Sequence, residues 1–139
     1  MALDRATAKV GDTHTQVVVE DLTRTQIVMY AGASGDYNPV HSDERYAVEV
    51  AGFPGVFAHG MLTMGMSGRA VTDLVGPDRL VRYGGRFKSQ VWPGDTLTAT
   101  VTVEALREEG DDHLVDLTVV TVNQRGDEVF AGAATARLA

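Results

Sequence analysis

Residues 59–75 constrain the fold most strongly, because they predict a long helix without a polar face. The residues are apolar or small almost all round, and a helix of this kind is expected to be buried. Its glycines lower helix propensity by about 1 kcal/mol each relative to alanine, which is consistent with close approach of another backbone. Its methionines are interpreted as core filler. The rest of the chain must supply a surface that covers this helix.

The residues after Gly76 and Pro77 predict that surface, because the hydrophobic period changes there from helical to two. Four alternating stretches predict consecutive antiparallel strands, separated by turns rich in Gly, Pro and Asp. The predicted strands are residues 81–91, 97–104, 113–123 and 128–138. Together they would form a sheet with one face available to the helix.

The N-terminal part predicts an arm over residues 1–14, a strand over residues 15–20 and then a helix. Thr23 and Gln26 have the spacing of a capping box, and Gly35 is a typical residue for a helix end. Ser42 is predicted to cap a second, short helix, and residues 51–58 to form a loop. The fold class expected from this order is α+β, with residues 1–139 as a single domain whose buried helix lies against a curved antiparallel sheet.

Charge and composition exclude several classes of function. The net charge of −7 argues against nucleic acid or an anionic membrane as the main partner. The chain has no cysteine, which excludes disulfides and thiolate chemistry. It lacks an apolar run of the roughly 20 residues that a membrane helix needs, and its start lacks a secretory pattern. A cytoplasmic location is therefore expected.

A short loop between the predicted helices carries the candidate chemistry. Pro39 prevents a helix there and Gly35 permits a sharp turn, so Asp36 and His41 can be aimed at one point. An imidazole can exchange protons near pH 7, with a carboxylate to orient it or share the work. The N–H of Gly60, at the start of the long helix, suits a developing oxyanion. The competing interpretation is a plain turn in which Asp36 is only a cap.

Several further residues have two interpretations each. Phe53 and Phe57 would either line an apolar pocket or simply pack under their loop. A basic set would either face the phosphates of an anionic ligand or form a solvated strand face. That set is Arg82, Arg86 and Lys88. His59 could join Asp36 and His41 around a metal ion, but the spacings of common zinc motifs are absent, so no metal is expected.

The motif residues together resemble one known family. They are Gly35, Asp36, Asn38, Pro39, His41, Ala58, His59, Gly60 and Met61, with Pro93, Gly94 and Asp95 further along. The pattern resembles the MaoC-like, or hydratase 2, family of (R)-specific enoyl-CoA hydratases and 3-hydroxyacyl-thioester dehydratases. Residues 58–65 are especially similar to the B-type subunit of mycolic-acid-pathway dehydratases. The resemblance implies a single hotdog fold, in which a curved antiparallel sheet wraps a long central helix.

The resemblance also implies roles for individual residues. Asp36 and His41 would be the catalytic pair, Asn38 would help to position them, and the Gly60 N–H would bind the thioester carbonyl. The expected substrate contacts are His59, Met61, Phe53, Phe57 and Ser67. Ser67 enters because some family members carry a serine on the central helix at the position of Gly68, and Ser67 is adjacent. No cofactor and no metal is implied.

The expected activity is (R)-specific hydration of trans-2-enoyl thioesters and its reversal. The expected substrate is an acyl-CoA or acyl-ACP, and the expected assembly is a homodimer or higher oligomer, or a heterodimer with a second hotdog subunit. One alternative is a hotdog acyl-CoA thioesterase. The other is a non-catalytic subunit of a heteromeric dehydratase.

Overall fold

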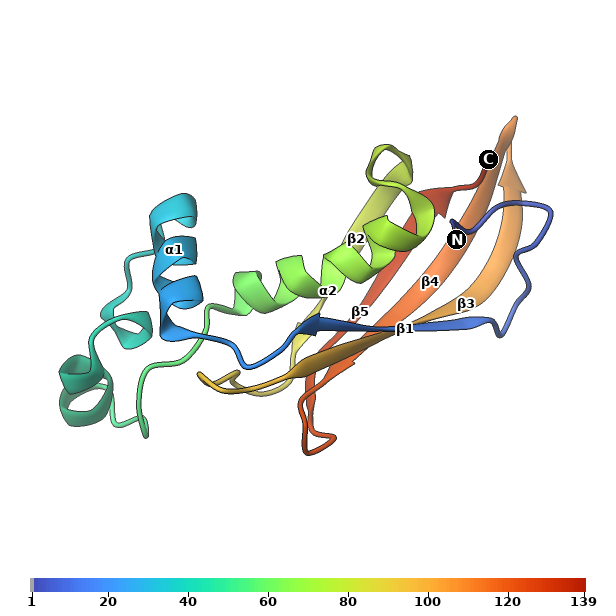
Figure 1. The fold of residues 1–139 in the computed structure, drawn as a ribbon. Helices are drawn as coiled ribbons and strands as arrows, with labels where there is room; N and C mark the ends of the chain where they lie inside the picture. Colours follow the sequence, from blue (N-terminus) through green and yellow to red (C-terminus); the bar gives the residue numbers. More distant parts are fainter. Residues whose placement is uncertain (1) are drawn as a thin grey trace.

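One antiparallel sheet and one long helix form the main body of residues 2–139, which are the residues described by the computed structural model (Figure 1). In chain order the elements are β1 (Thr13–Val19), α1 (Arg24–Ser34), the 3₁₀ helix η1 (Pro39–His41), the π-helix η2 (Tyr46–Val50), α2 (Gly60–Val75), the 3₁₀ helix η3 (Pro77–Arg79), β2 (Leu80–Phe87), β3 (Leu97–Glu109), β4 (Asp112–Val122) and β5 (Glu128–Arg137). The α+β class predicted from the sequence is therefore confirmed.

The strands are ordered β1-β3-β4-β5-β2 in the sheet, and each neighbouring pair is antiparallel. β2 is consecutive with β3 in the sequence, yet it pairs with β5 at the far edge. The predicted run of consecutive strands therefore holds for β3 to β5 but not for β2. The segment between β2 and β3 is long enough to carry the chain from one side of the sheet to the other.

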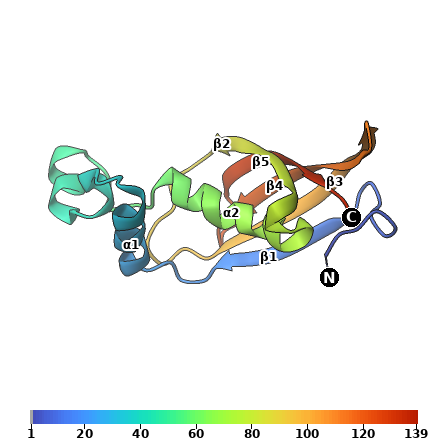
Figure 2. The same cartoon turned by 90° about the horizontal axis from the view of Figure 1, so that it is seen from above.

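The helix α2 lies along the curved face of this sheet and contacts all five strands within residues 2–139 (Figures 1 and 2). Its sheet-facing side is buried and joins the hydrophobic core with Val71, Leu74 and Val75. The opposite side is exposed at every fourth residue, at Met61, Gly65, Arg69 and Asp73. The prediction of a helix buried on all sides was therefore wrong, because a single sheet layer covers only one side.

The strand bounds differ from the predicted ones by a few residues. β3 continues to Glu109 through an irregularity between Val103 and Ala105, which lengthens the hairpin with β4. β2 ends at Phe87, where the chain leaves the sheet edge. β1 begins at Thr13, so the predicted arm is shorter, and its first residue, Met1, lies outside the described residues. No helix in the described part of the chain combines the length and the apolar character that a membrane crossing needs.

The helix α1 and the segment that follows it extend beyond one end of the sheet (Figures 1 and 2). The capping box of Thr23 and Gln26 is formed, and Gly35 ends the helix in the left-handed conformation at φ 74°. The second helix is capped by Asp43, whose Oδ1 accepts from the Tyr46 N–H at 3.1 Å, and not by Ser42 as predicted. Ser42 still belongs to the preceding turn, since its N–H donates to the carbonyl of Pro39.

Candidate active site

The loop that carries Asp36 is held by short hydrogen bonds between its own side chains and backbone. The Asp36 N–H donates to Ser34 Oγ at 3.1 Å, and the Asn38 N–H donates to Asp36 Oδ1 at 3.3 Å. Asn38 Oδ1 in turn accepts from the Val40 N–H at 3.2 Å and so caps η1. These turns are the local device by which Asp and Asn fix a non-helical backbone.

His41 is held from one side by the main chain of the loop before α2. Its Nδ1 lies 2.6 Å from the carbonyl oxygen of Phe57, and because a carbonyl oxygen only accepts, Nδ1 carries the proton. The other nitrogen, Nε2, therefore has a free lone pair in the neutral ring. Burial lowers the pKa of His41; the Phe57 hydrogen bond and the Asp36 charge oppose this, whereas His59 adds to it. A lowered pKa keeps the ring neutral and able to take a proton near pH 7.

His59 lies directly beneath His41 and is almost completely buried, at 1% exposure. The two rings stack with centroids 3.9 Å apart, and Tyr30 meets His59 edge-on at 4.8 Å. His59 Nε2 lies 3.0 Å from the main-chain carbonyl of Asp36. Its predicted contact with a substrate finds no support in this geometry, because the side chain has no accessible surface to offer.

Asp36, His41 and His59 each place a potential ligand atom within 4.8 Å of the others. Imidazole lone pairs lie in the ring planes, and these two planes are stacked at 28° to one another. Planes in that arrangement do not converge on one ion at the metal–nitrogen distance of about 2.0–2.1 Å. The geometry therefore fits proton exchange better than metal binding.

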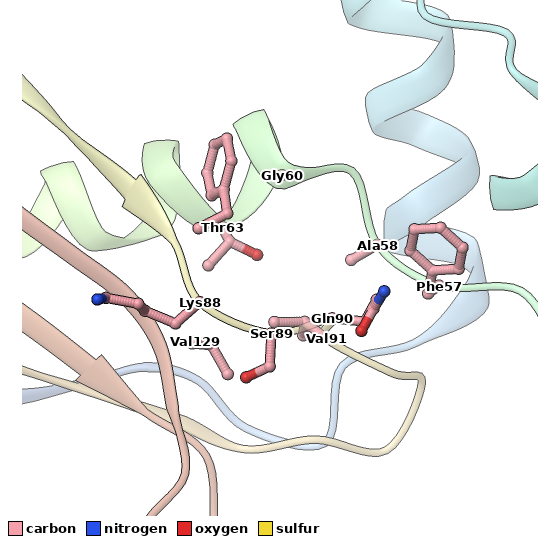
Figure 3. A pocket seen from close by; sticks show the side chains of 10 residues that line it. Phe57, Ala58, Gly60, Thr63, Lys88, Ser89, Gln90, Val91 and Val129 are labelled. Carbon is pink, nitrogen blue, oxygen red and sulfur yellow. The ribbon is translucent and has the colours of Figure 1, made fainter.

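A cavity of about 260 Å³ lies next to the first turn of α2 (Figure 3). The Gly60 N–H belongs to this turn. The N–H groups of a first helical turn have no acceptors within the helix. A side chain on Gly60 would meet the ring of Phe87 at 2.9–3.0 Å, so glycine leaves the amide next to the aromatic wall. The lining residues are Phe57, Ala58, Gly60, Thr63, Phe87, Lys88, Ser89, Gln90, Val91 and Val129.

The acid–imidazole pair borders this cavity without lining it. Phe57 connects the two, because its carbonyl binds His41 while its residue lines the cavity. Asp36 is exposed to solvent, and His41 is 8% exposed. The carbonyl of Phe57 thus connects the imidazole of His41 to the wall of the cavity.

The remaining predicted contacts fall in different places. Phe53 does not line the cavity; it packs on Phe57 with ring centroids 4.7 Å apart. Met61 is 56% exposed at the start of α2. Ser67 is fully buried and hydrogen-bonded to Thr121 Oγ1 at 2.7 Å, so it faces the sheet instead of the cavity. No part of the described structure gives Ser67 access to a ligand.

Several cavity residues, Thr63 and Phe87 among them, were not predicted from the sequence. Thr63 follows Gly60 by one helical turn, a spacing that could have identified it. Phe87 reaches the cavity from β2, and only the pairing of β2 with β5 brings it there. The predicted basic set divides, because Lys88 lines this cavity whereas Arg82 and Arg86 line a separate hollow beside Asp116 and Thr118.

Comparison with known proteins identifies relatives across nearly the whole chain. A family model described as "MaoC like domain" matches residues 5–124. Peroxisomal enoyl-CoA hydratase 2 of Arabidopsis thaliana is 35% identical over 102 residues, which is 71% of this chain and 33% of that protein. The chain spans 33%, 32% and 26% of the length of three curated relatives that it matches, about a third or less of each.

Solved structures share the fold over almost all of the chain. The (R)-hydratase from A. caviae involved in PHA biosynthesis superposes with a TM-score of 0.83 at 28% identity, covering 96% of this chain and 98% of that one. The ChsH1–ChsH2 complex from Mycobacterium tuberculosis gives a TM-score of 0.77 at 26% identity, covering 96% of this chain and all of the matched one (100%). The expected hotdog fold is confirmed.

Proposed function

The chain belongs to the MaoC-like domain family, and on this premise we propose that it is a hydro-lyase acting on acyl thioesters. The proposed reaction is (R)-specific addition of water to trans-2-enoyl thioesters and the reverse dehydration of 3-hydroxyacyl thioesters. The single observation that carries the proposal is the meeting of Asp36 and His41 beside the first turn of α2, where Gly60 offers its N–H. Residues 1–139 would act as one MaoC-like domain.

The thioester carbonyl would accept a hydrogen bond from the Gly60 N–H. Addition at C3 makes the thioester enolate-like, and negative charge builds on this oxygen. The start of α2 adds the positive end of the helix dipole at the same point. One preorganised donor in such a position contributes about 10²–10³ in rate.

The water would be held between the carboxylate of Asp36 and Nε2 of His41. The hydrogen bond to Phe57 commits the Nδ1 proton, so Nε2 is free to take a proton from the water as its oxygen bonds to C3. The proton that Nε2 has taken from the water is then delivered to C2, so that His41 is neutral again and the enolate-like intermediate becomes the 3-hydroxyacyl thioester. Dehydration follows the same steps in reverse, with no net change in the enzyme.

The surface around the site supports an assembly of hotdog subunits. Tyr37 is 71% exposed, Met61 56% and Phe87 50%, although all three adjoin the site. A second hotdog subunit would cover them and complete the acyl pocket. The solved relative from M. tuberculosis is a complex of two different chains, whereas this chain has both Asp36 and His41. Both a homodimer and a heterodimer with a non-identical hotdog subunit are compatible with this surface.

The proposal is tested by hydration of crotonyl-CoA and of longer enoyl-CoAs by the purified protein, with its mass in solution recorded alongside. We expect Asp36→Ala and His41→Ala each to lower kcat by about 10²–10⁴-fold while the fold is retained. His14→Gln, a histidine on β1 outside the site, is the matched control and should leave kcat unchanged.

Two outcomes would contradict the proposal. Retained hydration in both Ala variants would remove the mechanism. Release of free thiol from a saturated acyl-CoA, together with failure to hydrate enoyl-CoAs, would instead identify a thioesterase. Inactivity of this chain that is relieved by a second hotdog subunit would place the site in a heterodimer.

A further inference from the structure

One buried imidazole has no part in the proposed proton transfers. His59 is 1% exposed, and its Nδ1 has no hydrogen-bond partner among the residues that the structure describes. It occupies the N-cap position of α2, yet its side chain makes no capping hydrogen bond. Leaving a buried acceptor unpaired is destabilising, and an apolar side chain at this position would avoid that loss.

The contact that His59 does make joins two separate parts of the site. Its Nε2 lies 3.0 Å from the carbonyl oxygen of Asp36, and since that oxygen only accepts, Nε2 carries the proton and Nδ1 the lone pair. His59 directly precedes Gly60 in the sequence. One side chain therefore joins the backbone of the carboxylate loop to the backbone of the oxyanion donor.

The same ring also sets the orientation of His41. The His41 ring rests face-on against His59 at 3.9 Å, and Phe57 meets it edge-on at 5.1 Å. Its Nδ1 is fixed by the Phe57 carbonyl, which leaves rotation about that bond to be restrained by the stacked ring.

We propose that His59 is a positioning residue, which ties the Asp36 loop to the first turn of α2 and holds the His41 ring at the angle needed for proton transfer. The inference rests on the proposed function. It assigns to His59 no contact with the substrate. A displacement of about 1 Å between reacting groups costs on the order of 10²-fold in rate, so loss of this tether should appear in kcat rather than in KM.

Two substitutions separate the tether from simple filling of space. In His59→Gln the amide nitrogen is as many bonds from Cβ as the histidine Nε2, so it can still donate to the Asp36 carbonyl. In His59→Asn the nitrogen is one bond short. We expect His59→Asn to lower kcat by about 10–100-fold with KM changed less than about twofold, and His59→Gln to restore kcat to within about threefold of the parent.

The pH profile gives a readout that a merely structural role would not move. Asn leaves space for water beside His41, so the acidic limb of kcat/KM should shift to higher pH in His59→Asn. Equal kcat in the Gln and Asn variants, with the acidic limb unmoved, would overturn the proposal. Thermal melts of both variants confirm that the comparison is made between folded proteins.

Imidazole ¹⁵N NMR of the parent protein tests the tether without any activity. We expect the His59 ring to be protonated at Nε2, with a slowly exchanging proton. Protonation at Nδ1, or rapid exchange at Nε2, would overturn the inference. If the parent hydrates no enoyl thioester, the proposed function fails, and the NMR result still decides the tether separately.

Discussion

The sheet with α2 and the lobe formed by residues 36–59 bury different kinds of side chain. In the sheet half, the largest fully buried side chains are apolar, such as Phe130, Leu97 and Leu117. The buried hydroxyls of Ser67 and Thr121 in that half pair with each other. In the lobe, two imidazoles are buried, bonded to main-chain carbonyls, and one ring nitrogen is left unpaired.

The two regions also differ in the regularity of their backbones. The sheet is a regular ladder, whereas the lobe contains a 3₁₀ turn, a π-helix and a loop held by its own side chains. Irregular helices of this kind occur frequently at functional sites. The sheet half therefore stabilises the fold, whereas the lobe places polar groups at some cost in stability.

The largest effect is expected from a substitution in the sheet half, which should lower stability and leave activity unchanged. Leu117 on β4 is 1% exposed, belongs to the hydrophobic core and is not among the residues that line the cavity beside Gly60. Leu117→Ala should lower the free energy of unfolding by about 2–5 kcal/mol, because it leaves a cavity in a closely packed core. Urea unfolding measures the loss. A folded fraction with normal kcat per folded molecule is expected, and a specific loss of kcat at equal folded fraction would contradict the division.

Two glycines of α2 offer a matched pair that sharpens the comparison. A Cβ on Gly60 would approach the Phe87 ring, and a Cβ on Gly68 would approach the Tyr83 ring, in each case at about 2.9 Å. Phe87 is half exposed, so in Gly60→Ala its ring can move into the cavity. Because this displaces groups around the Gly60 N–H, Gly60→Ala should lower kcat by about 10²-fold.

Tyr83 cannot move as freely, because its hydroxyl donates to the Met64 carbonyl at 2.7 Å. Gly68→Ala should therefore cost about 1–3 kcal/mol of stability through overpacking, reduced by the better helix propensity of alanine, with kcat unchanged. Thermal melts and crotonyl-CoA kinetics on both variants check the pair. The same phenotype in both would show that the first turn and the middle of α2 are not functionally distinct.

A smaller effect is expected for Ser67, which the family resemblance suggested as a substrate contact. Ser67→Ala leaves Thr121 Oγ1 buried without its partner and should cost about 1–2 kcal/mol. Adding Thr121→Val should restore part of the loss, since both polar groups are then removed. Values of kcat and KM within about twofold of the parent are expected. A raised KM in the single variant would support a contact between Ser67 and the substrate.

The smallest expected effect concerns pH. Burial lowers the pKa of His41 below its usual value of about 6.5, so the acidic limb of kcat/KM should lie below pH 6.5. The same shift contributes stability that is complete above the unfolded pKa and is lost as the pH falls through the folded pKa. ¹H NMR titration of His41 and pH-dependent melts test both statements, and a limb above pH 6.5 would contradict them.

Local patterns predicted most of the sheet half. The capping box of Thr23 and Gln26 is a contact between near neighbours, and alternation over residues 97–104 is repeated at every step of the strand. The position of β2 could not be predicted in this way, because alternation shows that a strand exists but not which strand it pairs with. The exposed side of α2 was missed because only Arg69 and Asp73 mark it, whereas Met61 and Gly65 on the same side resemble the residues of the buried side.

The site was predicted in its residues more than in its contacts. The sequence identified Asp36, His41 and Gly60 as candidates. The structure brings Asp36 and His41 together with His59, the residue that directly precedes Gly60. The sequence could not identify the carbonyls of Phe57 and Asp36 as partners of the two histidines, since a main-chain oxygen has no sequence signature. The cap at Asp43 was missed because the turn from Pro39 extends one residue further than expected.

The far-edge position of β2 has a consequence for biogenesis. During synthesis, Phe87 leaves the ribosome well before its only hydrogen-bonded strand neighbour in the described sheet, which begins at Glu128. The aromatic wall over the first turn of α2 can therefore assemble only after that later segment has emerged. Nascent chains that stop short of it should stay bound by chaperones, although the segment with Asp36, His41 and Gly60 has already been synthesised.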